Sequence, residues 1–123
     1  MKLGLIMVLT PDLAEADRFY RDVLGLVLID RTPNQLVFDL AGTEFHVFQC
    51  AEAAAEHRHA SSAATICVFE VASIDAAMSS MKDKGVVFIH HTPAQDARGG
   101  FRYAAFGAPG GNIHEIIERC PKY

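Results

Sequence analysis

The sequence predicts an α+β fold of two tandem βαβββ modules whose strands form a curled mixed sheet around a cleft. The same order of an apolar strand, an amphipathic helix and three further strands occurs twice along the 123 residues. Glycines mark equivalent points of the two copies, since Gly25 and Gly85 follow the helices and Gly42 and Gly111 precede the final strands. We therefore expect a single domain over residues 1–123, with module one at 1–50, a linker at 51–64 and module two at 65–119.

Module one begins with an apolar run at residues 3–9, which predicts a strand covered on both faces. Thr10 is expected to cap the following helix, with Pro11 at its first position, and Gly25 is expected to end it. The apolar face of this helix consists of Leu13, Ala16, Tyr20 and Val23. Three strands are expected next, at residues 26–31, 35–40 and 43–49.

Module two repeats this order, with a strand expected at residues 65–71 and a helix capped by Ser73 and ended by Gly85. The apolar positions of this helix are Ile74, Ala77, Met78 and Met81. Strands are expected at residues 86–90, 101–106 and 112–117. The glycine-containing loop at residues 92–100 is a candidate lid, and the alanine-rich linker is expected to be partly helical.

Composition and charge exclude several classes of function. The net charge is −4 and no run of Lys or Arg occurs, so we expect no nucleic-acid partner. The apolar stretch near the N-terminus is too short to span a membrane, so no membrane partner is expected. The three cysteines are odd in number and widely spaced, which favours a reduced, cytoplasmic location.

Two candidate catalytic residues occupy equivalent points of the two modules. His46 follows Gly42 by four residues, as Glu115 follows Gly111 by four, so both are expected to face the same cleft. A carboxylate on an apolar strand needs a partner when it is buried. Three interpretations stay open: a buried pair of His46 with Glu115, a two-residue metal site completed by waters, and a metal-free acid/base pair.

Three segments resemble the vicinal oxygen chelate superfamily. TPDLAEADRFYRDVLGL at residues 10–26 resembles its first helix, FEVASIDAAMSSMKDKGV at 69–86 its second strand–helix unit, and FGAPGGNIHEIIE at 106–118 its closing motif. The superfamily includes glyoxalases, extradiol dioxygenases, fosfomycin-resistance enzymes and bleomycin-resistance proteins. The resemblance covers nearly the whole chain and implies a glyoxalase-like fold, whereas the fold alone does not define the reaction.

The resemblance also implies where a metal would be held. Glu115 matches the closing-strand glutamate ligand and His46 matches a fourth ligand position, so these two are the candidate metal ligands. The other two ligand positions fall on Leu5 and Ile66, whose side chains cannot bind a metal. The sequence therefore departs from the metal-binding pattern, and we expect no cofactor, with a divalent metal as the alternative.

The function expected from these residues is that of the bleomycin-resistance-like members, which bind a small apolar or aromatic molecule without a metal. A homodimer is the expected assembly. The candidate ligand-binding residues are Leu5, Phe48, Ile66, Arg102 and Ile113. The alternative is a glyoxalase-like lyase, isomerase or dioxygenase, in which a divalent ion polarises vicinal oxygens of the substrate.

Overall fold

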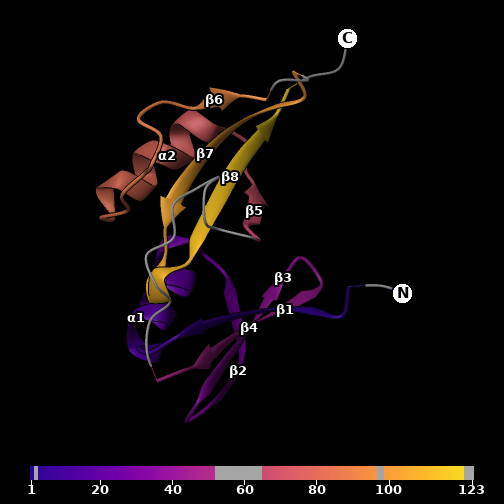
Figure 1. Ribbon diagram of the computed structural model, residues 1–123, viewed down its shortest axis with the longest axis vertical. Helices are drawn as coiled ribbons and strands as arrows, with labels where there is room; N and C mark the ends of the chain where they lie inside the picture. Colours follow the sequence, from indigo (N-terminus) through magenta and orange to yellow (C-terminus); the bar gives the residue numbers. More distant parts are fainter. Residues whose placement is uncertain (2, 52–64, 97–98, 121–123) are drawn as a thin grey trace. The chain divides into compact units, whose positions relative to one another are not determined.

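The computed structural model describes residues 1, 3–51, 65–96 and 99–120 of the chain (Figure 1). Its internal contacts group the chain into two units (Met1–Glu56 with Pro109–Asn112, and His57–Ala108 with Ile113–Tyr123). Each unit contains a four-stranded mixed sheet with a helix against one face. The predicted α+β class with two tandem modules is confirmed. Nearly all of the predicted linker, including its expected helix, lies outside the described residues.

Unit one follows the predicted order of elements. Its sheet has the strand order β1-β4-β3-β2, in which β1 runs parallel to β4 and the other pairs are antiparallel. The bounds predicted for β3 and β4 are confirmed. The elements are β1 (Leu5–Thr10), α1 (Leu13–Asp17), the π-helix η1 (Arg18–Val23), β2 (Val27–Thr32), β3 (Gln35–Leu40) and β4 (Thr43–Gln49).

Two expectations for unit one are wrong, namely the helix cap and the burial of the first strand on both faces. Thr10 is the last residue of β1, and the helix is capped instead by Asp12, whose Oδ1 accepts the N–H of Glu15 at 3.1 Å. The helix widens into π geometry, where the Leu24 N–H donates to the Phe19 carbonyl five residues earlier. The strand predicted to be covered on both faces is exposed on alternate residues in unit one, because the helix covers one face of the sheet and leaves the other face open.

The core of unit one is an aromatic cluster between the helix and the sheet. Tyr20 is fully buried, and its ring centroid lies 5.0 Å from that of Phe45 and 6.0 Å from that of Phe38. Leu36 and Val47 extend this layer on the neighbouring strands. Side chains alternate along a strand, so burial of this face places the intervening residues of β3 and β4 on the opposite face.

Unit two has the strand order β5-β8-β7-β6, with β5 parallel to β8. The prediction that Ser73 caps its helix is confirmed, since the Ser73 hydroxyl accepts the N–H of Ala76 at 3.2 Å. No helix in the described part of the chain is long and apolar enough to cross a membrane. The elements are β5 (Cys67–Glu70), α2 (Ile74–Asp83), β6 (Ala94–Gln95), β7 (Phe101–Gly107) and β8 (Ile113–Arg119).

The prediction of a strand at residues 86–90 is wrong. This segment makes a single bridge, between Phe88 and Phe106, and the strand that pairs with the far edge of β7 is the short β6. Val87 and Ile89 are 77% and 48% exposed, so alternate side chains of the segment lie outside the core. The described part of the candidate lid thus contributes a strand to the sheet.

A buried histidine lies in the core of unit two. His114 is 1% exposed, and its ring packs edge-on against Phe69 and Phe106, with centroids 5.5 Å and 6.0 Å away. Burial disfavours the charged imidazolium and lowers the pKa of His114 to about 4. The residue is therefore neutral in the folded protein at neutral pH.

A turn from the C-terminal half completes unit one. The short helix η2 (Pro109–Gly111) and Asn112 lie against the end of β1, where the Asn112 Nδ2 donates to the Leu9 carbonyl at 3.0 Å and to the Pro109 carbonyl at 2.8 Å. Gly110 has a φ of +80°, and a Cβ at this position would lie 2.4 Å from the Leu9 carbonyl oxygen. Only glycine fits here without displacing the backbone.

Replacing Gly110 by Ala tests this close approach. We expect Gly110→Ala to lower the free energy of unfolding by about 2–4 kcal/mol, because left-handed strain adds to a clash with packed backbone. Gly42→Ala is the matched control: φ is +90° there too, but no atom lies within 4 Å of the added Cβ, so a loss of about 1 kcal/mol is expected. Equal losses in urea unfolding would contradict the packing of Gly110 against β1.

Burial of His114 predicts a pH dependence of stability. The unfolded histidine titrates near 6.5 and the folded one near 4, so below pH 6.5 the unfolded state binds more protons. The free energy of unfolding should therefore fall by roughly 3 kcal/mol between pH 6.5 and pH 4 through this residue. Urea unfolding of His114→Phe across this range should lack that contribution, whereas Ile116→Val should keep it. If the free energy of unfolding of His114→Phe changed with pH as steeply as that of the wild type, His114 would be excluded as the source of the pH dependence.

Candidate functional site

The open face of the unit-one sheet combines apolar and polar side chains. The register of β1 with β4 places Leu5 beside Glu44, Met7 beside His46 and Leu9 beside Phe48. These residues lie on the face opposite the aromatic core, because they alternate with buried Phe45 and Val47. Leu5, Met7 and Leu9 are 38%, 51% and 50% exposed. A row of exposed hydrocarbon thus lies next to half-buried His46 and Phe48.

His46 is held in place by two neighbours in unit one. The Gln35 amide nitrogen lies 2.8 Å from Nδ1 of His46, and Oε1 of Glu44 lies 3.2 Å from Nε2. An amide nitrogen can only donate, so Nδ1 accepts and the ring proton is on Nε2, from which it is donated to Glu44. The His46 side chain is only 14% exposed. Both ring nitrogens therefore have a protein partner, and the orientation of the ring is fixed.

Glu115 occupies the matching position on the sheet of unit two. It pairs with Ala105 of β7 and Val68 of β5, and it is half-buried. On the same face, Ile113 and Ile117 are 9% and 7% exposed. The acid thus lies in a mostly apolar row, as the sequence predicted. His46 and Glu115 belong to different units, and their pairing stays a prediction.

The remaining predicted ligand-binding residues take different positions. Phe48 lies on the open face two residues after His46, and Leu5 lies on the same face of the neighbouring strand. Ile66 is half-buried and lies one residue before β5. Ile113 is buried at the start of β8. Of the predicted set, the structure therefore brings Leu5, His46 and Phe48 to one surface.

Arg102 lies on the other face of its sheet from Glu115. Its β8 partner is Glu118, which is an odd number of residues from Glu115, and side chains alternate. The guanidinium of Arg102 contacts both carboxylate oxygens of Asp75 on α2 at 3.2 Å. This hydrogen bond raises the pKa of Arg102. In the structure Arg102 is thus engaged with the helix.

Several residues of these networks were not identified from the sequence. Gln35 contacts His46 because the β3–β4 register brings it diagonally across, and its position in the sequence gives no sign of this. Glu118 accepts the Ile74 N–H at 2.8 Å and so satisfies the start of α2. Side chains alternate along a strand, and both Glu118 and buried His114 are an odd number of residues from Glu115. The sequence could therefore have placed them on the face of the sheet that the helix covers.

The described donors do not fit the metal centre implied by the family resemblance. No group of three His, Cys, Asp or Glu side chains that could hold an ion occurs within residues 1, 3–51, 65–96 and 99–120. Catalytic zinc normally takes three protein ligands. Leu5 and Ile66 offer only hydrocarbon at two of the implied positions, and the nitrogens of His46 are already engaged by Gln35 and Glu44.

Solved structures share this fold over nearly the full chain. A glyoxalase/bleomycin resistance protein/dioxygenase from Nocardioides is 21% identical, with a TM-score of 0.77 over 100% of this chain and 87% of that one. The fosfomycin resistance protein FosX from Listeria monocytogenes is 16% identical, with a TM-score of 0.79 over 98% and 94%. Lactoylglutathione lyase from Agrobacterium tumefaciens is 20% identical, with a TM-score of 0.73 over 95% and 92%.

The curated proteins contain no significant match to this chain. At identities below 25%, the solved structures support the fold and leave the reaction open. The family model described as "Glyoxalase/Bleomycin resistance protein/Dioxygenase superfamily" matches residues 2–116. This match spans both modules and the closing strand. The chain therefore belongs to the glyoxalase/bleomycin resistance protein/dioxygenase superfamily.

Proposed function

We propose that this protein binds a small apolar or aromatic molecule without a metal ion, on the open sheet face that carries Leu5, Met7, Leu9, His46 and Phe48. The observation that carries the proposal is the row of three exposed apolar side chains on β1 next to a fixed polar group. Exposed hydrocarbon of this kind gains about 25 cal/mol per Å² when a ligand removes it from water. The family includes bleomycin resistance proteins by its description.

The polar residues of this face supply orientation. His46 is fixed between Gln35 and Glu44, so the direction of its ring does not have to be ordered when a ligand binds. Phe48, two residues along β4, offers an aromatic surface against which a planar ligand can stack. A few fixed polar groups within an apolar lining are typical of small-molecule sites.

The alternative is a metal-dependent lyase, isomerase or dioxygenase with His46 and Glu115 as ligands. A FosX structure from Listeria monocytogenes was determined with Mn(II) and 1S,2S-dihydroxypropylphosphonic acid, so a neighbour in this fold holds a metal. In this chain Leu5 and Ile66 stand at two of the positions where the family resemblance implies a metal ligand, and their hydrocarbon side chains cannot bind a metal. The donor set therefore favours the metal-free function.

The metal content of the purified protein tests this choice. We expect well under one divalent ion per chain by elemental analysis of protein prepared without chelator or a metal-binding tag, because the described donors do not form a three-ligand site. One tightly held ion per chain that is lost in Glu115→Gln and retained in the control Glu70→Gln would overturn the metal-free proposal.

Binding of an apolar probe tests the surface itself. With anilinonaphthalene sulfonate as the fluorescent probe, Met7→Gln and Leu9→Gln should each weaken binding about tenfold, corresponding to ~1.4 kcal/mol. Val87→Gln is the matched control, because Val87 is also an exposed apolar residue, at 77%, but lies in unit two. Unchanged affinity in both β1 variants, or an equal loss in the control, would exclude this face as the binding surface.

A further inference from the structure

Two arginines of unit one share a single buried carboxylate. Asp17, the last residue of α1, is 8% exposed. Its Oδ2 accepts a hydrogen bond from a terminal nitrogen of Arg21 at 2.8 Å and another from a terminal nitrogen of Arg31 at 2.6 Å. Arg21 lies in η1 and Arg31 lies on the edge strand β2. Two guanidinium groups are thus held against the same oxygen atom, where the helix meets the edge of the sheet.

The strand register places Arg31 on the helix side of the sheet. Its partner on β3 is Leu36, which is buried in the core under the helix. The preceding residue, Asp30, pairs with Val37, and Val37 pairs in turn with His46 on the open face. Side chains alternate along a strand, so Asp30 lies on the open face and Arg31 on the opposite one. The arginine pair is therefore separate from the apolar surface proposed above.

The charges around Asp17 do not balance. One carboxylate contacts two guanidinium groups, which leaves one positive charge in excess. A buried acid needs a partner, but one arginine is sufficient for that. A second like charge at the same oxygen adds repulsion between the two arginines, and an anion bound against both of them would offset this repulsion. The arrangement is thus complementary to a further negative charge.

Each arginine keeps most of its hydrogen-bond donors. In the part of the chain that the structure describes, Oδ1 of Asp17 is buried and has no hydrogen-bond partner, so neither arginine binds this carboxylate through two nitrogens. The side chains of Arg21 and Arg31 are 49% and 53% exposed. A carboxylate fills one guanidinium fork with its two oxygens, whereas a phosphoryl group has a further oxygen and can accept from two forks at once.

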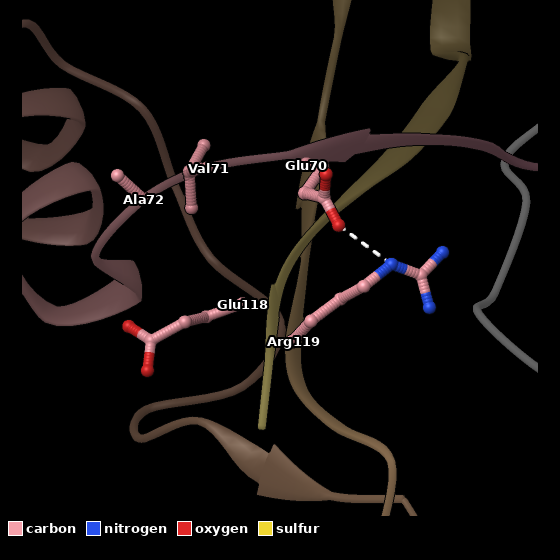
Figure 2. A pocket seen from close by; sticks show the side chains of 5 residues that line it. All are labelled: Glu70, Val71, Ala72, Glu118 and Arg119. Atoms are coloured by element: carbon pink, nitrogen blue, oxygen red, sulfur yellow. Dashed lines mark ion pairs between the residues drawn. The ribbon is translucent and has the colours of Figure 1, made fainter. Parts of the chain in front are cut away.

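The ion pair in unit two has no such excess of positive charge. Nε of Arg119 lies 2.6 Å from a carboxylate oxygen of Glu70, so one base faces one acid (Figure 2). A pocket of about 400 Å³ beside this pair is also lined by Glu118, which makes its charge negative. Arg119 is nevertheless an exposed arginine that contacts a carboxylate. It therefore serves as the matched control for the arginines of unit one.

We propose that Arg21 and Arg31 together bind a phosphoryl group, either as inorganic phosphate or as the phosphate of a small monoester. Asp17 is the positioning residue, because it aligns both guanidinium groups before the anion arrives and so reduces the side-chain order that binding must impose. The oxygens of the anion accept hydrogen bonds from the nitrogens that Asp17 leaves free. The net charge of −4 opposes binding of long polyanions, which favours a single phosphate group.

Titration of the wild-type protein with inorganic phosphate tests the site. The Nε–H signals of the arginines are followed by NMR at constant ionic strength, because salt screens exposed charges. The signals of Arg21 and Arg31 should shift together with one Kd of about 1 mM, whereas that of Arg119 should not move. Acetate should bind about tenfold more weakly, because it fills only one fork. Tighter binding of phenyl phosphate than of inorganic phosphate would identify a monoester as the ligand, and equal or weaker binding would identify free phosphate.

Substitutions test the contribution of each guanidinium. Arg31→Gln should weaken phosphate binding about tenfold, and Arg31→Lys should restore only part of it, because lysine keeps the charge and lacks the fork. Arg119→Gln should bind as the wild type does. The proposal is overturned if the wild-type signals of Arg21 and Arg31 do not shift together, if acetate binds as tightly as phosphate, or if Arg31→Gln and Arg119→Gln have equal affinities. The wild-type titration needs no substitution, so it decides the question even where a variant fails to fold.

Discussion

The packing of Tyr20 against Phe38 and Phe45 decides which side of the unit-one sheet becomes a core and which stays open. All three rings are fully buried between the helix and the sheet. Because side chains alternate along a strand, the neighbouring residues of β3 and β4 lie on the other face of the sheet. His46, Glu44 and Gln35 are positioned by this constraint. A shift of one residue in the register would move the histidine into the core and an aromatic ring into water.

The sequence predicted well those elements whose own residues determine whether a strand forms and where it begins and ends. β4 alternates between buried and more exposed positions, whereas β3 is buried at three consecutive residues, and turn residues bound both strands, so the predicted bounds agree with the structure. The segment at residues 86–90 has equally apolar residues but forms only one bridge to β7, because strand pairing depends on a partner that local pattern does not specify. Thr10 and Asp12 can both cap a helix, and Thr10 is instead the last residue of β1.

The candidate site divides in the same way. His46 and Glu115 could be identified from the repeat alone, since equal spacing from a turn glycine places both on strands. The partners of His46 could not, because Gln35 reaches it only through the β3–β4 register. Arg102 is the opposite case. The face of the sheet on which it lies depends on which β8 residue it opposes. A shift of one residue in this register would move its side chain from the face where it contacts Asp75 on α2 to the other face. Register is therefore the information that the sequence does not supply here.

The position of the Pro109–Asn112 turn also has a consequence for the order of synthesis. β1 is made well before the turn that covers its end, because Asn112 follows Leu9 by 103 residues. Until that turn leaves the ribosome, the carbonyl edge at Leu9 stays open, and open strand edges are places where wrong pairing begins. A fragment that ends after β4 would therefore contain every strand of the first sheet and still lack the residues that close its edge.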